Sequence, residues 1–137
     1  IDALDRLFRE FPSSWWGSRR TGRSFERAAD VYTQSNICWN NAIRDDVNMR
    51  VFEVLATRSF LLTQDVPTIH ELFTDGVHLV TWKDMTDCID KAHYYLEHEA
   101  ERKRIAEAGY QEVLAKHTVR HRVQRILEVC GVRVAGE

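Results

Sequence analysis

The fold is decided by residues 48–63, NMRVFEVLATRSFLLT. Residues 49–56 place apolar side chains on nearly every side of a helix, which predicts a helix packed between two layers. Residues 60–63 follow at once as a strand of the buried type. Glu53 is the lone carboxylate of this helix, and a carboxylate in apolar surroundings rarely lacks a partner. We therefore expect Glu53 to have either a structural partner or a ligand.

Composition narrows the class of protein. The chain has 137 residues, 44% of them hydrophobic, which fits one domain with a core. A formal charge of -2, from 19 basic and 21 acidic residues, predicts neither nucleic-acid nor anionic-membrane binding. No apolar run approaches the roughly 20 residues of a membrane span, and the first residues lack the regions of a signal peptide. We expect a cytoplasmic protein whose 3 cysteines are reduced core thiols.

Helices and strands are expected to alternate through the first 82 residues. The expected helices lie at residues 3–11, 24–32, 49–57 and 67–73, and the expected strands at 15–17, 36–39, 60–63 and 78–82. Short connections between alternating elements imply right-handed βαβ units. This predicts an α/β, Rossmann-like fold with a parallel sheet of about four strands and helices on both faces. Three amphipathic helices are expected to follow, with stripes at residues 85–96, 106–114 and 119–127.

The polar loop at residues 40–48 leaves the carboxyl end of a strand and enters the helix of Glu53. Ligands of open parallel sheets lie beyond such ends, and the start of a helix suits a phosphate or diphosphate. The candidate amide donors are those of Val47, Asn48, Met49 and Arg50. One turn further in, Glu53 could accept hydrogen bonds from ribose hydroxyls. The alternative is an Arg50–Glu53 pair at i, i+3, worth about 0.2 to 0.5 kcal/mol, and the residues alone leave both open.

Two further groups of polar residues are candidate ligand contacts. Arg19, Arg20 and Arg23 could neutralise a diphosphate, or they could simply form a solvated basic loop. His117 and His121 lie four apart, but Thr118 stands where a helix cap belongs and no third ligand follows at zinc-type spacing. We therefore expect no bound metal.

An ordered series of segments resembles a known family. The segments are residues 48–56, 59–63, 71–73, 75–76, 101–109 and 117–122. Together they resemble the C-terminal domain of group 1 glycosyltransferases, in particular the spore maturation protein CgeB-like branch, from about residue 32 to residue 127. The strength of the resemblance lies in the order of the segments rather than in any one motif.

The resemblance implies that residues 1–137 form the donor-binding half of a two-domain GT-B enzyme. It implies that Glu53 binds the ribose of a UDP- or GDP-linked sugar and that the amides before it receive the diphosphate, with no metal. The position eight residues before Glu53, where such enzymes often carry a second acid contacting the sugar, holds Asp45, one methylene shorter than glutamate. Where the family usually has a glycine after the helix, this chain has Thr57 and Arg58, so the helix must end without glycine's conformational freedom.

In the family the last helix crosses onto the other half of the enzyme. The chain opens with a helix already under way and without an initiator Met, so we expect a fragment that lacks its N-terminal, acceptor-binding domain and is inactive alone. An uncovered stripe on the last helix would then favour self-association; its members are Val119, Val123, Ile126, Leu127 and Val132. Two rival functions stay open: a non-catalytic interaction module that uses the C-terminal helices, and another GT-B activity such as a nucleotide-sugar epimerase.

Overall fold

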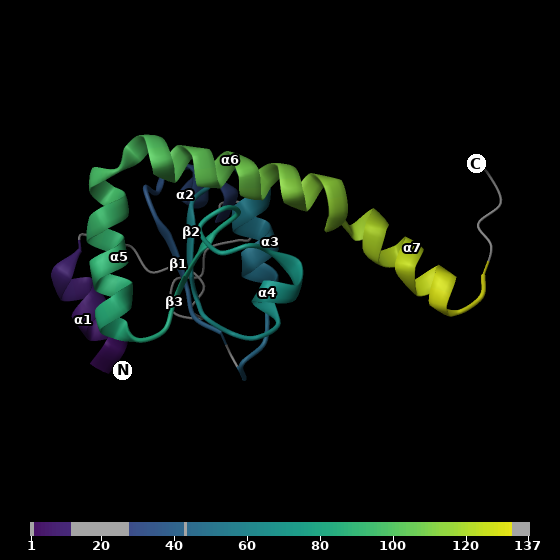
Figure 1. The fold of residues 1–137 in the computed structure, drawn as a ribbon, viewed down its shortest axis with the longest axis horizontal. Coiled ribbons are helices and arrows are strands. Elements are labelled where there is room, and N and C mark those ends of the chain that lie inside the picture. The colour runs from purple at the N-terminus through teal and green to yellow at the C-terminus, as the bar shows by residue number, and fades with distance from the viewer. Residues whose placement is uncertain (1, 12–27, 43, 133–137) are drawn as a thin grey trace.

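The computed structural model describes residues 2–11, 28–42 and 44–132 (Figure 1). Three parallel strands form an open sheet in the order β1-β2-β3: β1 (Cys38–Asn40), β2 (Leu61–Gln64) and β3 (Val80–Trp82). The parallel sheet and three of its expected strands are thus confirmed. The fourth expected strand, at residues 15–17, lies outside the described residues.

Seven helices surround or extend this sheet within the described ranges. They are α1 (Asp2–Glu10), α2 (Ala28–Gln34), α3 (Met49–Ala56), α4 (Ile69–Leu72), α5 (Met85–Glu97), α6 (Glu99–Lys116) and α7 (Val119–Val129). The last three are the consecutive C-terminal helices that the apolar stripes predict. In Figure 1 the sheet lies between α5 on one side and α3 with α4 on the other, while α7 projects away from the sheet. The α/β, Rossmann-like class is confirmed.

The sheet has a core on each face, as the pleat of a strand requires. Leu61 of β2 packs in one core with the buried residues of α3 and with Ile69, Phe73 and Val113. Its neighbour Leu62 packs in the other core, which is built from α1, α5 and the start of α6. Because both faces are covered, successive residues of β2 and β3 are buried, rather than only alternate ones.

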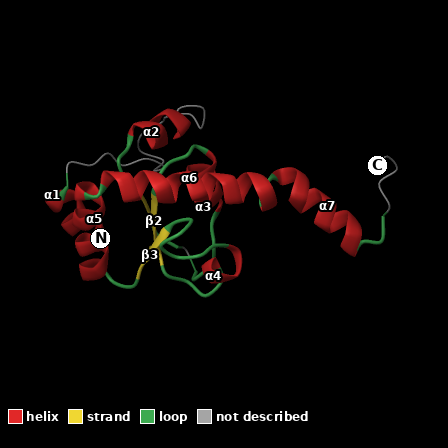
Figure 2. Ribbon diagram, turned by 45° about the horizontal axis from the view of Figure 1, so that its top comes forward, coloured by secondary structure: helices red, strands yellow, loops and turns green. Residues whose placement is uncertain are grey.

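Helix α6 closes the edge of the sheet where the strands begin (Figure 2). Gly109 of α6 lies against the backbone of His78, which precedes β3, and against Leu55 near the end of α3. The buried side chain of Arg102 donates hydrogen bonds to the carbonyl oxygens of Tyr95 and Leu96 at the end of α5. These carbonyls carry the negative end of a helix dipole, so they offset the buried charge.

Helix α3 ends without a glycine. Thr57 is the C-cap of α3, and Arg58 after it adopts a φ of 56°, in the left-handed region. The amides of Arg58 and Ser59 donate to the carbonyls of Leu55 and Val54, at 3.1 and 3.4 Å, which is a Schellman motif. The Arg58 guanidinium stacks over the Tyr110 ring at 4.3 Å and pairs with a carboxylate of α6, so the side chain compensates for the strained backbone.

Helix α7 buries none of its residues. Its apolar side chains are largely open, with Val119 and Val129 both 73% exposed and Ile126 60% exposed. The expectation of an uncovered stripe is confirmed for the described residues. Among the described helices, none is both long enough and apolar enough to cross a membrane.

Replacing Gly109 tests the close packing of α6. A Cβ at this position would lie 2.2 Å from the His78 carbonyl oxygen and 2.8 Å from a Leu55 methyl carbon. Gly109→Ala should therefore lower the free energy of unfolding by about 2 to 3 kcal/mol, although alanine is the better helix former. Urea denaturation measures this, with Gln111→Ala on the exposed side of α6 as a control that stays within about 0.5 kcal/mol. Equal stability of Gly109→Ala and the unaltered chain would contradict the packing.

A pair of variants at Arg58 isolates the cost of its backbone. Both Arg58→Gly and Arg58→Ala lose the contact with Tyr110, but only glycine relieves the left-handed conformation. We expect the glycine variant to be about 1 kcal/mol more stable than the alanine variant in urea denaturation. Ala56→Gly, two residues earlier and inside α3, is the matched control and should be destabilised by about 1 kcal/mol. An alanine variant as stable as the glycine variant would show that the backbone here carries no strain.

Candidate functional site

A chain of hydrogen bonds, centred on the buried Asn40, joins the carboxyl ends of two strands to the start of α3. Asn40, the last residue of β1, is only 1% exposed. Its Nδ2 donates to Thr63 Oγ1 on β2 at 3.0 Å, and its Oδ1 accepts from Asn48 Nδ2 at 3.2 Å. Asn48 Nδ2 also donates to the Asn41 carbonyl at 3.1 Å. Since a buried amide without partners costs about 1 to 3 kcal/mol, this chain fixes where α3 begins.

The first turn of α3 keeps its amides uncapped. Asn48 has the extended backbone of an N-cap residue, but its side chain makes no capping hydrogen bond. Its Nδ2 is held by Asn40 and Asn41, and its buried Oδ1, which would have to accept from an amide of the first turn, has no partner among the described residues. Within the described residues, the amides of Asn48, Met49 and Arg50 have no hydrogen-bond partner. They lie at the positive end of the helix dipole, so the arrangement favours an anion.

The amide of Val47 differs from the other three expected donors. It donates to Oδ1 of Asp46 at 2.7 Å, so a carboxylate of the chain itself already occupies it. An incoming phosphate would have to displace Asp46 to use this amide. Asp46 itself is exposed.

Glu53 lies one turn into α3 and is half-buried. No described residue donates a hydrogen bond to its carboxylate, and the ion pairs of lysine and arginine in the described chain involve other acids. The Arg50–Glu53 ion pair, the structural alternative for this residue, is therefore absent. The helix is also less enclosed than its sequence predicts, because Met49 in the first turn is 58% exposed.

Tyr32 of α2 lies beside Arg50 and Glu53. Burial raises the pKa of Tyr32, the Arg50 guanidinium opposes this rise, and the Glu53 carboxylate adds to it. Cys38 donates a weak hydrogen bond to the Tyr32 carbonyl at 3.6 Å, and burial raises the pKa of its thiol to about 12. Cys38 is therefore a core thiol rather than a nucleophile, as expected. The expectation of three core thiols holds for Cys38 and Cys88 and is wrong for Cys130, which is exposed.

Asp45, the residue expected to contact the sugar, lies in a loop with an unusual backbone. Asp45 is exposed in the loop before α3 and has a φ of 52°, and Arg44 beside it has a φ of 63°. Two successive residues in the left-handed region cost about 1 to 2 kcal/mol each, so the loop before the helix start is strained. Arg19 and Arg23 lie outside the described residues.

Comparison with known proteins identifies the family. Residues 1–128 match the family described as glycosyl transferase-like. The chain belongs to this family. It is also similar to the spore protein CgeB of Bacillus subtilis (strain 168), with 32% identity over 71 residues. That alignment covers 52% of this chain and 21% of the relative, and no solved structure matches the chain.

Among the described residues of this glycosyl transferase-like chain, potential metal ligands do not cluster. The part of the chain that the structure describes contains no group of three or more His, Cys, Asp or Glu residues that could hold a metal ion. Thr118 caps α7 as expected: its Oγ1 accepts from the amide of His121, whose Nδ1 in turn accepts from the amide of Thr118. His117 packs against the rings of Phe73 and Phe52 at 4.9 and 5.9 Å, and burial lowers its pKa. Thr118 and both histidines thus have structural roles.

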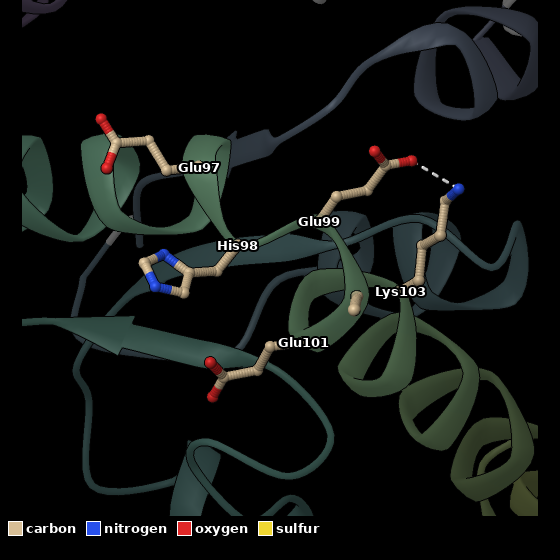
Figure 3. A pocket seen from close by; sticks show the side chains of 6 residues that line it. Glu97, His98, Glu99, Glu101 and Lys103 are labelled. Atoms are coloured by element: carbon tan, nitrogen blue, oxygen red, sulfur yellow. Dashed lines mark ion pairs between the residues drawn. The ribbon is translucent and has the colours of Figure 1, made fainter.

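An open depression lies at the bend between α5 and α6 (Figure 3). Arg102, just after this bend, bonds to Asn36 before β1, so the depression lies at the edge where strands begin, away from the start of α3. Glu97, Glu99 and Glu101 line it, and Lys103 pairs with Glu99. Three carboxylates with one paired lysine would repel a diphosphate. The depression is therefore not a candidate for the family's donor.

The sequence alone did not single out one polar pair at the carboxyl edge. Asp65 directly follows β2, and its Oδ1 lies 2.6 Å from Nε2 of His70 on α4. The position of Asp65 after a buried strand was a usable signal, because such positions gather at the ligand edge of a parallel sheet. The partner five residues later could be recognised only from the fold.

Proposed function

We propose that this chain binds the nucleoside-diphosphate sugar of a glycosyltransferase at the carboxyl edge of its sheet. Membership of the glycosyl transferase-like family supports the class of reaction. The observation that carries the site is Glu53, a half-buried carboxylate without a described partner, one turn beyond three amides that also lack one. UDP- and GDP-linked sugars are the donors we expect.

The diphosphate, the ribose and the sugar of the donor each have a proposed contact in this arrangement. The amides of Asn48, Met49 and Arg50 would receive the diphosphate, and Glu53 would accept hydrogen bonds from the ribose hydroxyls. Glu53 follows Met49 by four residues, which is about 6 Å along a helix axis, so phosphate and ribose can be held by one helix. Arg19 and Arg23 are proposed to add positive charge, and Asp45 to contact the sugar.

The chemistry follows from the same groups. As the glycosyl bond breaks, negative charge grows on the departing nucleoside diphosphate. Amides and a helix dipole that already point at this charge stabilise it without having to reorganise, and such preorganised stabilisation is often the largest single term in catalysis. In this proposal no metal is needed, because the backbone and the arginines supply the positive field.

The acceptor and the catalytic base are assigned to an N-terminal domain beyond this chain. The uncovered stripe of α7 is the surface that we propose this domain covers, because an exposed apolar stripe marks an interaction site. The same stripe supports a second candidate function, a non-catalytic interaction module that uses α7. Without the missing domain, the stripe would also favour self-association.

Binding of nucleotides distinguishes the two functions. In isothermal titration calorimetry, the chain should bind at least one of UDP, GDP and their sugars. Glu53→Gln should weaken this binding roughly 10- to 100-fold, because a hydrogen bond to a charged group contributes about 1.5 to 3 kcal/mol. The melting temperature should stay unchanged, since Glu53 has no described partner to lose.

Glu97→Gln, at the opposite edge of the sheet, is the matched control and should bind like the unaltered chain. Equal affinity of the Glu53→Gln variant would contradict the ribose assignment. No binding of any nucleotide would favour the interaction module.

A further inference from the structure

The Asp65–His70 pair lies at the same edge of the sheet as the proposed donor site. The amide of Asp65 donates to the carbonyl of Trp82 at 2.8 Å, so Asp65 still belongs to the edge formed by β2 and β3. Asp65 Oδ1 lies 2.6 Å from His70 Nε2. The Asp65 side chain is 27% exposed and the His70 side chain 47% exposed, so a ligand can reach both.

Hydrogen bonds and core packing connect the segment that carries Asp65 to the start of α3. Thr63, two residues before Asp65, bonds to Asn40, which bonds to Asn48 at the N-cap of α3. The buried side chain of Val66, next to Asp65, belongs to the core against which the half-buried Val47 packs. The pair and the uncapped amides are therefore held at the same edge of the sheet.

A further contact fixes α4 beside α3. The rings of Phe73, which follows α4, and Phe52 of α3 lie 5.8 Å apart. Phe52 immediately precedes Glu53. The histidine of α4 and the carboxylate of α3 are thus carried by two helices packed on the same face of the sheet.

The contact between Asp65 and His70 orients the ring. Because Asp65 occupies Nε2, the other ring nitrogen, Nδ1, is left for a second partner, and no described residue takes it. With Nε2–H donating to Asp65, a ring that also carries a proton on Nδ1 can donate to a phosphate oxygen on the other side.

We propose that His70, positioned by Asp65, binds the diphosphate of the nucleotide donor. The inference rests on the proposed function and adds to it an imidazole N–H donor carried by α4, at the same edge of the sheet as the amides of α3. In this arrangement His70 Nε2–H donates to Asp65 and Nδ1–H donates to a phosphate oxygen. Asp65 is a positioning residue, because it acts on the ligand only through the ring.

A ligand series separates this role from that of Glu53. The probes are the nucleoside, its monophosphate and its diphosphate, carrying whichever base the unaltered chain binds most tightly. His70→Gln should lower the affinity for the diphosphate about 10-fold and change the affinity for the nucleoside less than 2-fold. Glu53→Gln should weaken all three, because all three carry the ribose. Calorimetry or a nuclear magnetic resonance titration measures each affinity.

Asp65→Asn should weaken binding of the diphosphate about 3-fold and leave binding of the nucleoside unchanged. If the pair only anchors α4, the variant would instead change the melting temperature and leave the ratio of the two affinities unchanged. His98→Gln is the control: this exposed histidine lies at the opposite edge and also bonds within its own segment. It should alter neither affinity.

The outcomes distinguish this inference from the proposed function. If the unaltered chain binds the diphosphate and His70→Gln binds it equally well, or if the variant weakens nucleoside and diphosphate alike, the inference is overturned and the donor site on α3 stands. An effect seen only when a sugar is attached to the diphosphate also overturns it, because His70 would then contact the sugar. If no nucleotide binds the unaltered chain, the proposed function fails and the inference fails with it.

Discussion

The buried side-chain amide of Asn40 is the interaction on which the candidate site depends. It bonds to Thr63 on the neighbouring strand and to Asn48 at the start of α3, so one residue ties two strand ends to one helix end. An amide at 1% exposure needs these partners, because the cost of leaving it unsatisfied is comparable to that of a core mutation. The position of the helix start, and with it the direction of the free amides and of Glu53, follows from this requirement.

The two edges of the sheet have different roles. At the edge where strands begin, α6 closes the structure through the small residue Gly109 and the buried Arg102, whose charge is met by the carbonyls that end α5. At the edge where strands end, the described residues leave amides, a carboxylate and an imidazole nitrogen without partners. The packing that closes the sheet and the proposed ligand site thus lie at opposite ends of the same parallel strands, and ligands of open α/β sheets usually lie at the carboxyl end.

Local patterns predicted the frame of the structure but not the contacts that complete its site. The apolar run around Glu53 and the cap residue Thr118 depend on neighbours in sequence, so helix and cap were readable from the chain. The pairing of Asp65 with a ring on α4 depends on how a loop turns after its strand, and the occupation of the Val47 amide by Asp46 depends on a strained loop. Periodicity carries no information about either. The exposure of the first turn of α3 was missed for the same reason, since it depends on what lies beyond the strand ends.

A crystal structure of the complete enzyme with a nucleoside diphosphate tests the central claim most directly. The account predicts that the ribose hydroxyls lie within hydrogen-bond distance of the Glu53 carboxylate, and that phosphate oxygens accept from the amides of Met49 and Arg50. A nucleotide bound elsewhere, with the Glu53 carboxylate satisfied by side chains of the protein, would contradict it.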